Sequence, residues 1–149
     1  MNMKNSTCII RKIESKDYLS VAAVWREVLG ALEITDEAFV EICEKMKKDS
    51  RYCIFIAEKD GKIIGFVSTV EALAINLPNG YIKVNALAVL PEFRHCGIGK
   101  MLMERVEQLA GEHDISLIGI TSGFQRTKAH AFYEHLGYHK SSFWLSKRV

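Results

Sequence analysis

Apolar residues recur along the chain with two different spacings, and these spacings predict an alternation of strands and helices. Runs in which apolar and polar residues alternate, or in which apolar residues are continuous, indicate β-strands, whereas apolar residues three or four positions apart indicate helices. We therefore expect strands over residues 6–14, 52–58, 62–73, 81–90, 115–121 and 138–146. We expect helices over residues 15–32, 35–50, 97–113 and 126–137.

Particular residues mark several of the expected boundaries. Thr35 is a preferred N-cap residue and is followed by acidic side chains in the first turn of its helix. Gly30 is expected to stop the helix before it. Asp60-Gly61 stands between two apolar runs, which is a strong signal for a tight β-hairpin. Residues 76–80, with the sequence NLPNG, are expected to form a loop.

The order of these elements predicts a mixed α/β fold. The order is β, α, α, β, β, β, α, β, α, β, and the apolar central strands need cover on both faces of one mixed sheet. A chain of 149 residues has the size of one ordinary domain, and we find no linker or internal repeat. We therefore expect a single domain over residues 1–149.

Composition and charge exclude several classes of protein. Apolar residues make up 48% and charged residues 26% of the chain, as in ordinary globular proteins. The formal net charge of +2, from 20 basic and 18 acidic side chains, gives no reason to expect nucleic-acid binding. No apolar run is long enough to span a bilayer, and residues 1–14 lack the apolar region of a signal peptide, so we expect a cytoplasmic protein without a membrane partner.

The cysteines and histidines lack the spacing of a metal site. The four cysteines show no close pairing such as C-x-x-C, so free thiols are expected. His130, His135 and His139 do not repeat at i, i+4, so one helical face cannot offer a pair of ligands. We therefore expect no metal.

The stretch PEFRHCGIGKMLMERVEQLA, residues 91–110, is the strongest candidate for a binding site. Two glycines and three basic residues stand at the start of an amphipathic helix, where unpaired N–H groups and the helix dipole favour an anion. A plain strand-to-helix turn is the alternative. Neither the P-loop pattern nor the Rossmann glycine pattern fits, since Met101 follows Lys100 and Leu102 takes the place of the third glycine.

Two separate motifs resemble those of the Gcn5-related N-acetyltransferase family. The segment ALAVLPEFRHCGIGKMLM resembles the family's acetyl-coenzyme A (acetyl-CoA) motif, in which Arg or Gln is followed by x-x-Gly-x-Gly or Ala after a strand. The segment AHAFYEHLGY resembles the later helix, in which a tyrosine precedes Glu and a Leu-Gly-Tyr or Leu-Gly-Phe follows. The resemblance covers essentially the whole chain, although the first 50 residues match by pattern only, and implies the family's acyl-CoA N-acyltransferase fold.

The resemblance implies which residues bind acetyl-CoA. The backbone of Leu87, Ala88 and Val89 would pair with the pantetheine arm, and amides of this strand would hold the acetyl oxygen in the transition state. The pyrophosphate would lie against the loop and first helical turn, chiefly on main-chain N–H groups. The residues of this segment are Arg94, His95, Cys96, Gly97, Ile98, Gly99 and Lys100.

Proton transfer has two candidate residues. By resemblance, Tyr133 donates a proton to the departing thiolate, although its place among apolar residues at helical spacing also fits a core aromatic. Glu71 lies in an apolar strand run and is a candidate general base. The alternative for Glu71 is a solvated carboxylate at the edge of the sheet, and the base would then be water or a backbone carbonyl. Arg126 stands where many members of the family carry Asn, and would contact coenzyme A or the acceptor, or lie exposed at a helix start.

The sequence thus predicts an enzyme that transfers acetyl from acetyl-CoA to a primary amine of a small molecule, by direct attack in a ternary complex. A protein or peptide N-acetyltransferase is the enzyme alternative. A non-catalytic acyl-CoA sensor on the same fold is the alternative from another class. A homodimer is compatible with all three.

Overall fold

The computed structural model describes residues 7–149, which form two compact units, residues up to Gly119 and residues from Ile120 to Val149. Residues 1–6 lie outside the described residues, and they include Ser6, the first residue of the predicted first strand, and the start of the segment examined for a signal peptide. No helix among residues 7–149 is long and apolar enough to cross a membrane. The cytoplasmic location and the single domain stay predictions.

The strands form a mixed sheet with the order β1-β2-β3-β4-β5. The strands are β1 (Ile9–Lys12), β2 (Tyr52–Lys59), β3 (Lys62–Ala74), β4 (Leu77–Val89) and β5 (Ile118–Ile120), and β1 to β4 pair antiparallel. Asp60 and Gly61 turn β2 into β3 with φ of 52° and 76°. Two left-handed residues are what the tight hairpin turn needs, so the predicted Asp-Gly hairpin is confirmed.

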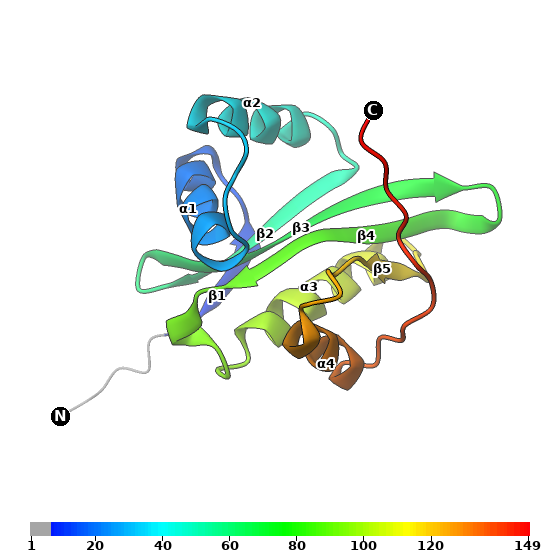
Figure 1. The fold of residues 1–149 in the computed structure, drawn as a ribbon. Helices are drawn as coiled ribbons and strands as arrows, with labels where there is room; N and C mark the ends of the chain where they lie inside the picture. The colour runs from blue at the N-terminus through cyan, green and yellow to red at the C-terminus, as the bar shows by residue number, and fades with distance from the viewer. Residues whose placement is uncertain (1–6) are drawn as a thin grey trace. The chain divides into compact units, whose positions relative to one another are not determined.

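Helices cover both faces of this sheet (Figure 1). The helices α1 (Tyr18–Val28) and α2 (Asp36–Lys47) lie on one face, and α3 (Ile98–Glu112) lies on the other, with short 3-10 turns η1 (Ser15–Asp17) and η2 (Pro91–Phe93) before α1 and α3. The Oγ1 atom of Thr35 accepts a hydrogen bond from Ala38 N at 3.1 Å, as an N-cap should. Gly30 follows α1 with φ of 104°, which confirms the predicted stop.

The core of the first unit lies between the sheet and these helices. Trp25 of α1 stacks on Phe66 of β3 with ring centroids 6.2 Å apart, and on the opposite face the guanidinium of Arg105 in α3 lies 4.5 Å from the ring centroid of Phe55. The largest fully buried side chains come from the sheet and from α3, and include Phe55, Phe66, Ile56, Ile64, Ile82, Leu102 and Met103. Apolar strands that are covered on both faces were the basis of the predicted fold class, and the mixed α/β fold is confirmed.

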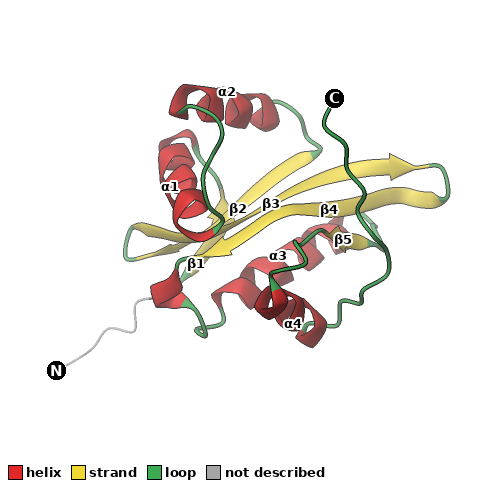
Figure 2. Ribbon diagram, in the orientation of Figure 1, coloured by secondary structure: helices red, strands yellow, loops and turns green. Residues whose placement is uncertain are grey.

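The predicted loop at residues 76–80 is wrong. β3 and β4 continue as a long hairpin, plainly visible in Figure 2, and only Ile75 and Asn76 form its turn. Pro78, Asn79 and Gly80 are turn formers by propensity, but they lie inside β4, where Asn79 and Gly80 have φ of 62° and 71°. A Cβ atom at Gly80 would lie 2.0 Å from the carbonyl oxygen of Ala72, so the close approach of the two strands requires glycine here.

The strand predicted over 115–121 is shorter than expected. β5 contains only Ile118–Ile120. Ile115 does not join the strand, because its N–H donates to the carbonyl of Ala110 in α3 at 2.8 Å and so belongs to the turn that follows the helix. Next to β5, a backbone hydrogen bond from Ile82 N to Leu117 O, 3.0 Å long, joins this segment to β4. The apolar run is thus split between a buried loop residue and a three-residue strand.

The second unit contains α4 (Thr127–His135) and the residues after it. α4 ends at His135 and is followed by its C-cap Leu136 and by Gly137, which has φ of 95°; Tyr138 N donates to Tyr133 O at 3.0 Å. The strand predicted over 138–146 is wrong, because these residues form no strand and nearly all of them are exposed. A strand needs a neighbouring strand to pair its backbone, and apolar residues such as Phe143 and Leu145 cannot supply that partner themselves.

Candidate active site

The turn before α3 has a backbone shape suited to binding an anion. His95 and Gly97 both have left-handed backbones, with φ of 62° and 79°, while Cys96 between them has a φ that is not positive. Alternation of left-handed and right-handed residues turns successive N–H groups toward one side and makes a concave anion site. Residues 94–97 are all exposed, so the concave side is open to a ligand.

The first turn of α3 adds further unpaired donors. Gly97 is the N-cap and provides no side-chain acceptor, and the first helical hydrogen bond joins Met101 N to Gly97 O at 3.0 Å. The N–H groups of Ile98, Gly99 and Lys100 come before it and have no acceptor within the helix. Together with the positive end of the helix dipole they favour a phosphate. We call the segment Arg94–Lys100 the anion cradle.

The cradle follows directly on the end of β4, where one hydrogen-bonding edge of the strand is turned away from β3; β5 joins this edge farther back, at Ile82. Leu90 N donates to Ile64 O of β3 at 2.8 Å. Because successive N–H groups of a strand point to opposite edges, the N–H groups of Leu87 and Val89 point away from β3. Their side chains are half-buried on the face of α3, whereas Ala88 between them is buried against α1. Leu87 to Val89 therefore offers an extended edge that a ligand chain can pair with.

A β-bulge in β4 precedes this edge. Ser68 pairs with Ala86 and Thr69 pairs with Val84, so Asn85 has no partner on β3. A bulge bends its strand and redirects the residues beyond it. The alternation of apolar residues in β4 continues through the bulge, since both faces of the sheet are covered, and so no sequence signal marked it.

Labelling of Cys96 tests the placement of the cradle. Cys96 is exposed, and its Sγ lies 3.5 Å from the carbonyl oxygen of Arg94, within the cradle. We expect a maleimide to modify Cys96 in the free protein and bound coenzyme A to slow this modification at least tenfold. Mass spectrometry of the labelled peptide measures the rate, and buried Cys43 is the internal control. Equal labelling of Cys96 with and without coenzyme A would place the ligand elsewhere.

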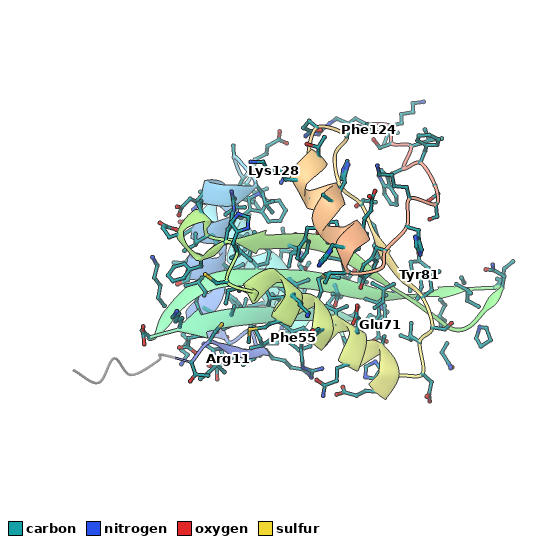
Figure 3. All side chains as sticks on the ribbon, turned by 90° about the horizontal axis from the view of Figure 1, so that it is seen from below. Arg11, Phe55, Glu71, Tyr81, Phe124 and Lys128 are labelled. Carbon is teal, nitrogen blue, oxygen red and sulfur yellow. The ribbon has the colours of Figure 1, made fainter. Side chains whose placement is uncertain are left out.

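Glu71 lies near the opposite end of α3 from the cradle. Its carboxylate pairs with Nδ1 of His113, the residue that caps the C-terminus of α3. Fifteen helical residues separate this end from Gly97, about 22 Å along the helix axis. Figure 3 shows Glu71 and Phe55 beside α3. The structure therefore does not bring Glu71 to the cradle, and its role as general base stays a prediction.

The second unit carries the remaining two candidates, and Arg126 begins its helix. Arg126 is the N-cap of α4, and its N–H bonds to the carbonyl of Gly123 at 3.0 Å. The same carbonyl accepts a hydrogen bond from Nε2 of His130 at 2.9 Å. These two hydrogen bonds fix the turn that leads into α4. They therefore also fix the backbone position from which the half-buried Arg126 side chain extends.

Tyr133 lies in an aromatic cluster of the second unit. Its ring makes edge contacts with Phe132 and Tyr138, with centroids 5.3 Å and 6.2 Å away. Burial raises the pKa of the Tyr133 hydroxyl to about 12, against a smaller opposite effect of the Arg126 charge. The hydroxyl therefore carries its proton throughout the neutral range, as a proton donor must.

The raised pKa of Tyr133 predicts a loss of stability in alkali. Below an unfolded-state pKa of 10.0 the hydroxyl is protonated in both states, and as pH rises toward the folded-state value of about 12 the unfolded state loses its proton first. Between about pH 9 and about pH 11, we expect the free energy of unfolding to fall by roughly 1 kcal/mol more in the wild type than in Tyr133→Phe. Urea titrations of both proteins measure the difference, and an equal fall in the two would contradict it.

Metal ligands do not gather anywhere in the part of the chain that the structure describes. Within residues 7–149 no group of three His, Cys, Asp or Glu side chains could hold a metal ion.

The anion cradle, the strand edge beside it and the order of elements can now be compared with known proteins. The family model described as "Acetyltransferase (GNAT) family" matches residues 13–138. The chain belongs to the GNAT acetyltransferase family. The resemblance found in the two sequence motifs is thereby confirmed, and the chain is an acetyltransferase.

Relatives of known sequence or structure agree with this assignment. The aminoalkylphosphonate N-acetyltransferase of Salmonella typhimurium is 27% identical, and the match covers 78% of this chain and 86% of that protein. The aminoglycoside N-acetyltransferase AAC(6')-Iy, solved in complex with CoA, has a TM-score of 0.87 at 18% identity and covers 100% of this chain and 99% of its own. Glucosamine-6-phosphate N-acetyltransferase from Arabidopsis thaliana has a TM-score of 0.82 at 21% identity, covering 95% of this chain and 98% of its own. The last two show the shared fold.

Proposed function

We propose that this GNAT protein transfers acetyl from acetyl-CoA to a primary amine of a small molecule, by direct attack in a ternary complex. The observation that carries the proposal is the anion cradle at the end of β4, next to a strand edge that is turned away from β3 at Leu87 and Val89. Coenzyme A is an anion with an extended arm, and it needs a phosphate site and a pairing edge next to each other. The residues from Leu87 to Lys100 offer both in one continuous segment.

Binding of the cosubstrate would rest on the main chain. The cradle N–H groups would take the pyrophosphate, with Arg94 and Lys100 adding positive charge. The main-chain groups of Leu87 and Val89 would form hydrogen bonds with the amide groups of the pantetheine arm, while the buried side chain of Ala88 packs on the α1 side of the sheet. An N–H group of this edge would also stabilise the acetyl oxygen as it becomes negative.

The transfer itself needs one bond formed, one bond broken and two proton movements. The amine nitrogen attacks the thioester carbonyl carbon, the new C–N bond forms and the C–S bond breaks. Tyr133 would give its proton to the departing thiolate, and its deprotonated hydroxyl would recover a proton from solvent. The amine loses a proton to a base, for which Glu71 and water are the candidates. Arg126 would contact coenzyme A or the acceptor.

The acceptor class is supported by the relatives. The related Salmonella enzyme acts, by its name, on aminoalkylphosphonates, and the two structural neighbours act on aminoglycosides and on glucosamine-6-phosphate. All three names denote small molecules that carry an amine. We therefore place the acceptor of this chain in the same class, and leave a homodimer as a prediction.

A panel of amines tests the proposed function. Release of free CoA thiol from acetyl-CoA is measured with an aminoalkylphosphonate, an aminoglycoside, an amino sugar phosphate, a polyamine, an amino acid derivative and peptides with free N-termini. We expect turnover with at least one small amine and little with peptides. Turnover with peptides alone would instead identify a peptide N-acetyltransferase. Tight binding of acetyl-CoA without turnover of any amine would identify a sensor.

A further inference from the structure

Two lysines face each other at the end of the β2–β3 hairpin, next to the anion cradle. Lys59 is the last residue of β2 and Lys62 the first of β3, and the two are direct cross-strand partners. Like charges placed directly opposite each other destabilise a sheet. A pair of this kind therefore calls for an explanation beyond folding.

Both ammonium groups lie over the ring of one aromatic residue. Lys59 Nζ is 5.8 Å and Lys62 Nζ is 5.9 Å from the ring centroid of Phe93, in the range of cation–π interactions. Phe93 is the last residue of η2, which lies close to the β2–β3 hairpin (Figure 1). The half-buried ring thus holds two flexible side chains at one place on the surface.

Neither ammonium group of this pair is held in an ion pair with a carboxylate within residues 7–149. Of the two carboxylates next to Lys59 in the sequence, that of Glu58 is bonded to Arg11 at 2.9 Å, and that of Asp60 belongs to the hairpin turn. Phe93, whose ring both lysines contact, directly precedes Arg94, the first residue of the cradle, and the Cα atoms of these two residues are about 3.8 Å apart. An anion with two phosphate groups one sugar apart can occupy both the lysine pair and the cradle.

We propose that Lys59 and Lys62, held by Phe93, bind the 3′-phosphate on the ribose of coenzyme A. This inference rests on the proposed function, in which the cradle takes the pyrophosphate. The ribose that bears the 3′-phosphate follows the pyrophosphate directly, so the 3′-phosphate lies within one sugar of the cradle. The pair therefore distinguishes coenzyme A from its dephospho form.

Affinities for acetyl-CoA and acetyl-dephospho-CoA test the inference. We expect the wild type to bind acetyl-CoA at least tenfold more tightly, which corresponds to about 1.4 kcal/mol. In Lys59→Gln/Lys62→Gln the two affinities should become equal within about twofold, because only the affinity for acetyl-CoA falls. Lys59→Arg/Lys62→Arg should keep the preference. Lys45→Gln/Lys48→Gln removes the same charge from exposed positions on and just after α2, and should also keep it.

The outcomes separate this inference from the proposed function. Equal wild-type affinity for the two ligands, or an unchanged preference in Lys59→Gln/Lys62→Gln, would overturn the 3′-phosphate site alone. Failure of both ligands to bind the wild type would overturn the proposed function and the inference with it. The melting temperature is a second readout: relief of the like-charge pair should leave the Gln variant at least as stable as the wild type, and a clear loss of stability would show that the lysines serve folding.

Discussion

Replacing Tyr133 by Phe should lower kcat by at least tenfold while leaving acetyl-CoA affinity and folding nearly unchanged. The variant keeps the ring that contacts Phe132 and Tyr138, and it removes only the hydroxyl. General acid catalysis is typically worth 100-fold to 10,000-fold, so a tenfold loss is the minimum that the role requires. Steady-state kinetics with the best amine of the panel measure kcat, and calorimetric titration measures affinity.

A neighbouring tyrosine provides the matched control. Tyr138→Phe also removes one hydroxyl from the same aromatic cluster, and it should leave kcat within about twofold. A structural role for Tyr133 predicts a different pattern, in which the melting temperature falls and kcat stays near the wild-type value. That result would assign the proton donor to water or another side chain.

Replacing Gly97 by Val should raise the dissociation constant of acetyl-CoA at least tenfold, about 1.4 kcal/mol. The Cβ of a residue at this position has no protein atom within 4 Å, so the new side chain projects into the open space where the proposed pyrophosphate would lie. The positive φ of 79° adds strain for a β-branched residue. Calorimetric titration with acetyl-CoA measures the loss.

Strain and steric exclusion can be separated with a second glycine. Gly30 also has a positive φ, 104°, and no atom within 4 Å of its Cβ, but it lies after α1, away from the cradle. Gly30→Val should lower the melting temperature as Gly97→Val does, yet bind acetyl-CoA with wild-type affinity. Unchanged affinity in a folded Gly97→Val protein would contradict the cradle.

Features that depend on a few neighbouring residues could be predicted from the sequence. Thr35 and Gly97 are the N-caps of α2 and α3, and Asp60-Gly61 forms the hairpin turn, because capping and left-handed turns are decided within three or four residues. The anion cradle was predictable for the same reason. Its main-chain donors belong to one short segment, and no distant contact is needed to expose them.

Features that depend on pairing between distant segments could not be predicted. The bulge at Asn85 is set by the partners that Val84 and Ala86 find on β3, and apolar residues on both faces conceal the change of register. Residues 138–146 have the composition of a strand but form none. Glu71 was predicted by its place in an apolar strand, yet its partner His113 lies 42 residues away in the sequence and could not be foreseen.

The most direct test of direct transfer is a single-turnover experiment with acetyl-CoA labelled in its acetyl group. The protein in excess is mixed with labelled acetyl-CoA and the best amine of the panel, and the label is then counted on the amine, on the protein and in free acetate. Direct attack in a ternary complex predicts that all transferred label is on the amine, and that no label leaves acetyl-CoA when the amine is omitted. Label bound to the protein, or released as acetate without the amine, would contradict it.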